Sequence, residues 1–181
     1  DVAEIDATSV RRHVAFLPTT ARMFPGTLLD NVAMFREGEA QRHAVETLRE
    51  LGLHDYIASL PKGLETEIGG AQTKMLPAGF TQALAIARAL VDDRQIVLFD
   101  YAHKSIDHLH DRRLLELIAR MKGRKTLILV TQRPSYLRLC DRVLELENGG
   151  LKDLPAPTAT TREAARGQTA PPLTAASAGA A

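Results

Sequence analysis

The residue that the sequence places best for chemistry is Asp100, which ends a short apolar run. Residues 95–100 read Gln-Ile-Val-Leu-Phe-Asp, and an apolar stretch of this length predicts a short strand. A carboxylate at the carboxyl end of a parallel strand lies where α/β sheets bind ligands. In nucleotide-binding proteins such a carboxylate holds magnesium, directly or through water. The alternative interpretation of Asp100 is an ordinary capping or turn residue.

A histidine-rich stretch follows Asp100 and raises a second possibility, a metal site. It contains His103, His108 and His110 together with the carboxylates Asp107 and Asp111. Residues two apart on a helix point to different sides, so His108 and His110 do not converge on one ion. Asp107 also suits the N-cap of the helix that follows. The pattern favours a solvated polar loop over a metal site.

Composition narrows the function classes. The 181 residues are 45% apolar and 25% charged, with 23 basic against 22 acidic side chains. This composition predicts one domain with a substantial core, and the balanced charge gives no basic face for nucleic acid. No apolar run approaches the roughly 18 residues of a membrane span, and no signal peptide opens the chain. We therefore expect a soluble domain without a nucleic-acid partner.

The cysteine content and the first residue add two expectations. The single cysteine, Cys140, excludes an internal disulfide and fits a reducing compartment. Nothing in the neighbouring sequence activates its thiol, so we expect a buried structural cysteine. The chain begins at Asp1 in a strand-like stretch, which predicts a fragment or a processed product.

Short strand-like runs alternate with helical patterns up to residue 154, as is typical of an α/β sheet. A helix with an apolar face at Leu114, Leu117, Ile118 and Met121 is expected to end at Gly123. Residues 155–181, rich in Ala, Thr and Pro, predict a disordered tail. The other expected elements are strands at 14–18, 96–100, 126–131 (a buried strand) and 142–146, helices at 28–35, 40–51, 82–91 and 135–139, and a turn at 148–150.

Several segments, in this order, resemble the ATP-binding cassette of ABC transporters. Asp100 matches the Walker B aspartate and Asp107 the D-loop aspartate. The similarity covers residues 1 to about 151 and is greatest to the exporter branch, and within it to bacterial type I secretion. The other matching segments are residues 14–19 and 23–32 (Q-loop region), 60–69 (before the signature), 76–90 (signature loop and helix), 131–134 (switch-histidine loop) and 141–143 (the strand after it).

This resemblance implies a P-loop NTPase-like α/β fold over residues 1–154, with a parallel core sheet and a helical subdomain at about 28–92. The Walker A loop, GxxxxGKS/T, is absent from the sequence, because the nearest stretch, residues 123–126, has the wrong spacing. In the family that loop lies upstream of the point where this chain begins. The expectation is therefore the C-terminal part of a cassette, lacking the Walker A portion.

The resemblance also assigns site residues, and this sequence matches them only in part. Tyr101 stands at the catalytic glutamate and Gln132 at the switch histidine, and a phenol is a poor general base at neutral pH. Pro77 at the signature serine removes both a hydroxyl and a backbone N–H. These changes predict a degenerate cassette that does not hydrolyse ATP alone. The remaining implied nucleotide-site residues are Thr19 (Q-loop position), Leu76, Ala78, Gly79, Gln82 and Asp107.

Cofactors and partners follow from the same resemblance. It implies ATP and Mg²⁺, with Asp100 assisting magnesium once a Walker A loop is supplied upstream or by a partner. It also implies a second cassette, in a homo- or heterodimer, and the transmembrane domain of an exporter at the cytoplasmic face of the membrane. The alternatives are a non-catalytic regulatory or interaction module that keeps only the dimerisation surface, and a remnant without function. An incomplete sheet would expose apolar edges and favour aggregation.

Overall fold

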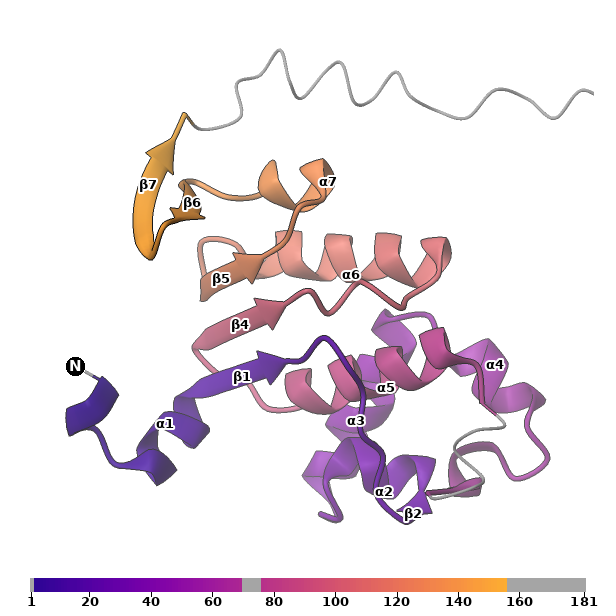
Figure 1. The fold of residues 1–181 in the computed structure, drawn as a ribbon. Coiled ribbons are helices and arrows are strands. Elements are labelled where there is room, and N and C mark those ends of the chain that lie inside the picture. Colours follow the sequence, from indigo (N-terminus) through magenta and orange to yellow (C-terminus); the bar gives the residue numbers. More distant parts are fainter. Residues whose placement is uncertain (1, 70–75, 156–181) are drawn as a thin grey trace, which may run out of the picture. The chain divides into compact units, whose positions relative to one another are not determined.

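The computed structural model describes residues 2–69 and 76–155 (Figure 1). Two compact units, considered separately here, divide the chain between Gln132 and Arg133. The first contains a parallel sheet with helices, which confirms the predicted α/β class. Its helices are η1 (Val2–Glu4), α1 (Ala7–His13), α2 (Leu28–Ala33), α3 (Glu39–Glu50), α4 (His54–Ser59), η2 (Gly63–Glu65), α5 (Ala78–Leu90) and α6 (His108–Met121).

Three parallel strands form the sheet at the centre of the first unit. They are β1 (Val14–Leu17), β4 (Ile96–Asp100) and β5 (Thr126–Val130), in the order β1-β4-β5. In the register, Leu17 pairs with Phe99 and Asp100 with Val130. The strands' carboxyl ends therefore meet at one edge, where the expected site residues lie.

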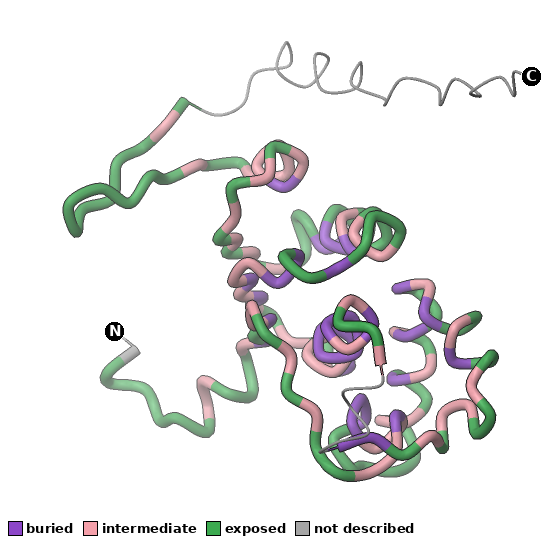
Figure 2. Tube along the Cα trace, turned by 45° about the vertical axis from the view of Figure 1, so that its right-hand side comes forward, coloured by how far each residue is buried: buried purple, intermediate pink, exposed green. Residues whose placement is uncertain are grey.

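The two faces of the sheet differ in their cover. Ala15, Leu17, Val97 and Phe99 are buried on one face, and Figure 2 shows the large helices on one side of the strands. Alternate residues point to the other face and are partly or fully exposed. The prediction of a buried strand at 126–131 is therefore wrong for one face of β5, because the described residues leave that face open.

The helices follow their apolar patterns. In α6 the predicted face of Leu114, Leu117, Ile118 and Met121 is buried, and Gly123, with φ 80°, follows the helix end. The Asp107 side chain accepts from the His110 N–H at 3.0 Å, which confirms the predicted N-cap. Helix α5 begins four residues earlier than predicted, at Ala78, and buries most of its length.

The prediction for the N-terminal stretch is wrong. The stretch was expected to be strand-like, but it forms η1 and α1, and the Asp6 side chain caps α1 by accepting from the Ser9 N–H at 3.0 Å. A good N-cap outweighs the weak strand pattern of this short segment. Four further elements of the first unit were not predicted, because they are too short to show a clear period: α4, η2 and the antiparallel pair β2 (Gly26–Thr27) and β3 (Glu67–Ile68).

The second unit contains α7 (Pro134–Leu137) and an antiparallel hairpin of β6 (Val143–Glu147) and β7 (Gly150–Leu154). The predicted turn is confirmed, with φ 48° at Asn148 and 78° at Gly149. Strand β7 was not predicted. Cys140 is half-buried, and its thiol donates to the Tyr136 carbonyl at 3.7 Å.

Two further observations concern the chain as a whole. From residue 156 on, the predicted tail lies outside the described residues. Within residues 2–69 and 76–155, no helix has the length and hydropathy needed to cross a membrane.

Candidate functional site

Asp100 and Thr19 meet at the carboxyl edge of the sheet. Asp100 is the last residue of β4, and Thr19 follows the end of the neighbouring β1. The Thr19 hydroxyl donates to the Asp100 backbone carbonyl at 2.9 Å and lies 3.4 Å from its Oδ2. A hydroxyl and a carboxylate thus lie together where parallel sheets bind ligands.

The residues after Asp100 turn sharply and pack on the end of β5. Tyr101 has φ 46°, an uncommon conformation for a bulky residue, and its N–H donates to the Val130 carbonyl at 3.0 Å. Its ring stacks on His103, with centroids 6.2 Å apart. His103 Nε2 lies 3.2 Å from the Thr131 hydroxyl.

His103 is buried rather than solvated, which corrects part of the polar-loop prediction for this stretch. Its ring also packs 5.3 Å from that of Phe99, so the aromatic neighbours explain its burial. The described residues contain no group of three or more His, Cys, Asp or Glu side chains that could hold a metal ion.

Gln82 of α5 connects three segments of this edge. Its side chain is 1% exposed, and Nε2 donates to the Pro18 carbonyl at 2.7 Å and to the Ala102 carbonyl at 3.0 Å. These carbonyls stand next to Thr19 and Tyr101 in sequence. One buried amide therefore fixes the loops that carry two of the predicted site residues.

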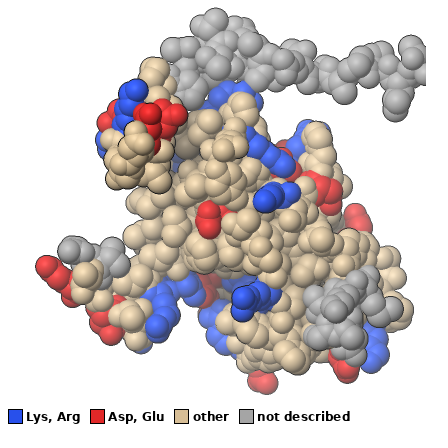
Figure 3. Space-filling model, in the orientation of Figure 1, with Lys and Arg blue, Asp and Glu red and all other residues tan. Residues whose placement is uncertain are grey.

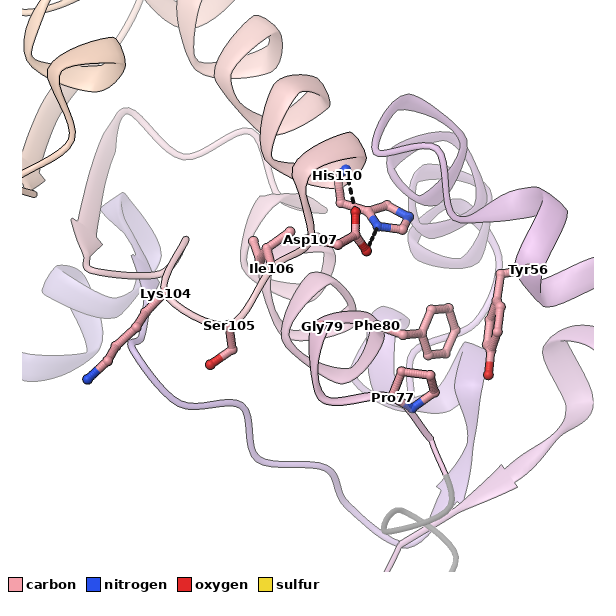
Figure 4. A pocket seen from close by; sticks show the side chains of 9 residues that line it. All are labelled: Tyr56, Pro77, Gly79, Phe80, Lys104, Ser105, Ile106, Asp107 and His110. Carbon is pink, nitrogen blue, oxygen red and sulfur yellow. Dashed lines mark hydrogen bonds and ion pairs between the residues drawn. The ribbon is translucent and has the colours of Figure 1, made fainter. Parts of the chain in front are cut away.

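A hollow of about 500 Å³ lies where the start of α5 meets residues 104–107 (Figure 4). Pro77 is the N-cap of α5, with no side-chain capping bond. A Cβ at Gly79 would stand 3.0 Å from the Ser105 carbonyl oxygen, so a larger residue would require the segment at Ser105 to shift by a few tenths of an ångström. The rings of Tyr56 and Phe80 also line this hollow, and their centroids lie 4.4 Å apart.

Asp107 and His110 pair at the edge of this hollow. Asp107 Oδ2 lies 2.6 Å from His110 Nδ1, as the dashed line in Figure 4 marks. Partial burial acts to raise the pKa of Asp107, but hydrogen bonds from the His110 N–H and side chain outweigh it and lower the pKa. Asp107 therefore stays ionised and holds the His110 ring in place.

The sequence is similar to those of ABC exporter proteins. No protein-family model matches the chain. The chain is 33% identical over 150 residues to the ATP-dependent lipid A-core flippase of Syntrophus aciditrophicus, covering 82% of this chain and 25% of the flippase. It is 33% identical to the type I secretion system ATP-binding protein PrsD of Rhizobium meliloti, covering 81% and 25%.

The fold of the chain is also similar to a solved structure of an ABC exporter. The structure of a bacterial Atm1-family ABC exporter with ATP bound matches with a TM-score of 0.78 and 28% identity, over 93% of this chain and 29% of that one. The chain is a homologue of the ATP-binding cassette of ABC exporters. It spans about a quarter of the length of the curated relatives it matches.

The structure brings some of the cassette's expected site residues together and separates others. Thr19 contacts Asp100, and Gly79 lies against the segment that leads into Asp107. Tyr101 directly follows Asp100, whereas Gln132 is exposed and makes no hydrogen bond to Asp100 among the described residues. Leu76 and Ala78 flank Pro77; Leu76 is half-buried and Ala78 exposed.

Gln82 requires a correction. It was expected to lie on the signature surface of the cassette, yet it is buried and its amide is used within the fold. The physical reason is the helical period: Gln82 lies four residues into α5, on the face turned toward the sheet.

Two contacts at the sheet edge were not predicted from the sequence. The bond between Thr19 and Asp100 and the pair of His103 and Thr131 join residues 81 and 28 positions apart. The strand register explains both contacts. It places the end of β4 between the ends of β1 and β5, and the contacting residues all lie at or just after these three strand ends.

Proposed function

We propose that this chain is part of an ABC exporter cassette that couples ATP binding to transmembrane export, and that it does not hydrolyse ATP alone. The proposal treats residues 1–154 as the C-terminal part of the cassette, with a helical subdomain at about 28–92. It works with a second cassette and a transmembrane domain at the cytoplasmic face of a membrane. The observation that carries it is Asp100, held by Thr19 at the end of β4 and followed by Tyr101 instead of a carboxylate.

The oxygen donors at the sheet edge suit magnesium. The Asp100 carboxylate and the Thr19 hydroxyl are hard oxygen ligands of the kind Mg²⁺ prefers. When bound, Mg²⁺ neutralises charge on nucleotide phosphates. The phosphate-binding Walker A loop is not among the 181 residues, so this chain's contribution is to orient the Asp100 carboxylate through Thr19.

The replaced positions explain why hydrolysis fails. Tyr101 is a poor acceptor for the proton of an attacking water at neutral pH. Gln132 can donate a hydrogen bond to a phosphate but carries no charge. At the start of α5, Pro77 offers neither a hydroxyl nor an N–H, so Gly79 and its neighbours give the opposite cassette a weaker phosphate contact.

Turnover of ATP by the purified full chain tests this proposal. We expect phosphate release at the level of an Asp100→Asn variant, with or without Mg²⁺. Steady turnover above that variant contradicts the proposed inactivity. Co-elution with an active exporter cassette only when ATP and Mg²⁺ are present supports the nucleotide-dependent pair.

One observation favours the second candidate, a non-catalytic interaction module. The surface around Gly79 and Asp107 is closely packed, with a capped α6, while the catalytic positions are replaced. A module of this kind would bind an active cassette equally well without nucleotide, so the same co-elution experiment separates the two functions.

A further inference from the structure

The buried ring of His103 joins the segment after β4 to the end of β5. His103 is 4% exposed, and its ring packs with those of Phe99 and Tyr101, whose centroids lie 5.3 Å and 6.2 Å away. The planes of the Tyr101 and His103 rings are 12° apart, so these two rings are stacked. His103 Nε2 lies 3.2 Å from the hydroxyl of Thr131, the first residue after β5. One imidazole therefore holds both the Tyr101 ring and the end of β5.

Asp100 and Tyr101 are adjacent in sequence, but their contacts lead to opposite neighbours of β4. The Asp100 Oδ2 lies 3.4 Å from the hydroxyl of Thr19, which follows β1. The Tyr101 N–H donates to the Val130 carbonyl at the end of β5, and the ring stacks on His103. Within the described residues, no hydrogen bond joins the Tyr101 hydroxyl to the Asp100 carboxylate. The carboxylate thus makes its contact toward β1, and the ring makes its contacts toward β5.

The open face of the sheet offers the Tyr101 ring a competing position beside Asp100. Val130 pairs with Asp100 in the register and is 42% exposed. Figure 3 shows mostly uncharged surface around the end of β4, and an aromatic ring gains free energy in water by packing on apolar surface. A Tyr101 ring without its stacked partner would pack on this surface and cover the carboxylate.

We infer that His103 is a positioning residue, which holds the Tyr101 ring toward β5 and so keeps the Asp100 carboxylate accessible to magnesium and phosphate. A phenol ring is large enough to cover a neighbouring side chain, so the bulk of Tyr101 needs a partner that fixes it. The stacked ring of His103 is that partner. The purpose of this arrangement rests on the proposed function, whereas the ring contact itself needs no nucleotide.

Acrylamide quenching of tyrosine fluorescence tests the ring contact. The chain has no Trp and three Tyr; Tyr136 is fully buried, and a Tyr56→Phe background removes the signal of the half-buried Tyr56. In this background, His103→Leu keeps an apolar side chain but removes the ring, so we expect the quenching constant to rise severalfold. His103→Phe restores a ring and should be quenched like the background protein.

Circular dichroism and the urea midpoint show whether each variant is folded. In the unchanged chain, nuclear Overhauser cross-peaks between the ring protons of Tyr101 and His103 test the same contact without a substitution, and we expect to observe them. Three results would overturn the inference: unaltered quenching in folded His103→Leu, an equal rise in folded His103→Phe, or absence of the cross-peaks.

Co-elution with an active exporter cassette in the presence of ATP and Mg²⁺ tests the consequence for Asp100. We expect His103→Leu to weaken this co-elution severalfold and His103→Phe to retain it. In a Tyr101→Ala background, His103→Leu should have no effect, because no ring remains to cover the carboxylate.

Equal weakening by the two His103 variants, or a further loss in the Tyr101→Ala background, would overturn the inference by giving His103 a purely structural role. The quenching and the cross-peaks are measured without nucleotide. Failure of the unchanged chain to co-elute would therefore contradict the proposed function, while the ring measurements still decide the role of His103.

Discussion

Gln82 shows how one side chain can hold the sheet edge together. Its amide donates to two carbonyls, of Pro18 and Ala102, that lie in different loops. Buried carbonyls that lose their donor keep the desolvation cost without the bond. The loops that carry Thr19 and Tyr101 are therefore held by a residue that bonds to the backbone of their neighbours, Pro18 and Ala102.

A Gln82→Leu variant should lose about 2–4 kcal/mol of unfolding free energy, because both carbonyls lose their donor inside the fold. Urea denaturation followed by circular dichroism measures the loss. Gln95→Leu, the same change at an exposed position before β4, should cost less than about 0.5 kcal/mol. Equal losses in the two variants would show that the hydrogen bonds of Gln82 contribute nothing special.

At the scale of residues, the sequence predicted the position of Asp100 in the fold better than the contacts around it. The short apolar strand with a terminal carboxylate placed Asp100 correctly at the edge of a parallel sheet. The burial of Gln82 and His103 could not be predicted from the sequence, because a polar side chain is usually buried only where hydrogen-bond partners lie close to it. Those partners lie on other elements, and one sequence does not reveal their distance.

Asp92 links separate elements where α5 gives way to β4. Its carboxylate accepts from Arg36, which follows α2, and from Arg94, which itself donates to the Val14 carbonyl at the start of β1. Partial burial acts to raise the pKa of Asp92, but hydrogen bonds from Arg94 and Arg36 and their charges outweigh it and lower the pKa. The ionised form is therefore favoured by the folded state.

A folded-state pKa below the unfolded value makes this contribution depend on pH. The stabilisation of the folded state by ionised Asp92 is complete above the unfolded pKa of about 3.9. It is lost as the pH falls through the folded pKa. Asp92→Asn should cost about 0.5–1 kcal/mol at pH 7, because the group is partly exposed. The difference from the unchanged protein should shrink between about pH 4 and pH 2.

Urea denaturation of both proteins across this pH range measures the difference. Glu46→Gln, which neutralises an exposed carboxylate of α3, provides the control and should show no such convergence. A constant difference at all pH values would show that Asp92 acts through packing and not through its charge.

Among the elements, long periodic segments were predictable and short ones were not. The face of α6 and the strands β1, β4 and β5 follow from their patterns. Helix α1 has no buried residue, so it has no apolar face to detect, and β2 has only two residues. Strand β7 reads Gly-Leu-Lys-Asp-Leu, a weak strand sequence that forms because the turn before it pairs it with β6.

For the first unit as a whole, the open face of the sheet is the dominant feature. Parallel sheets are normally covered on both faces, but here Ile128 and Val130 are 50% and 42% exposed on one face. Phe16 lies on the same side of the sheet, two strands away. The hydrophobic effect favours any contact that removes this surface from water.

The purified chain should therefore self-associate as its concentration rises, and Ile128→Thr/Val130→Thr should reduce this severalfold, because threonine keeps the β-branched shape while making the face polar. Size-exclusion chromatography with light scattering measures the average mass. Ile5→Thr/Leu109→Thr changes two residues that are 50% and 60% exposed but lie outside the sheet, and it should associate like the unchanged chain. A monomer at all concentrations, or equal effects of the two double variants, would show that the open face does not drive association.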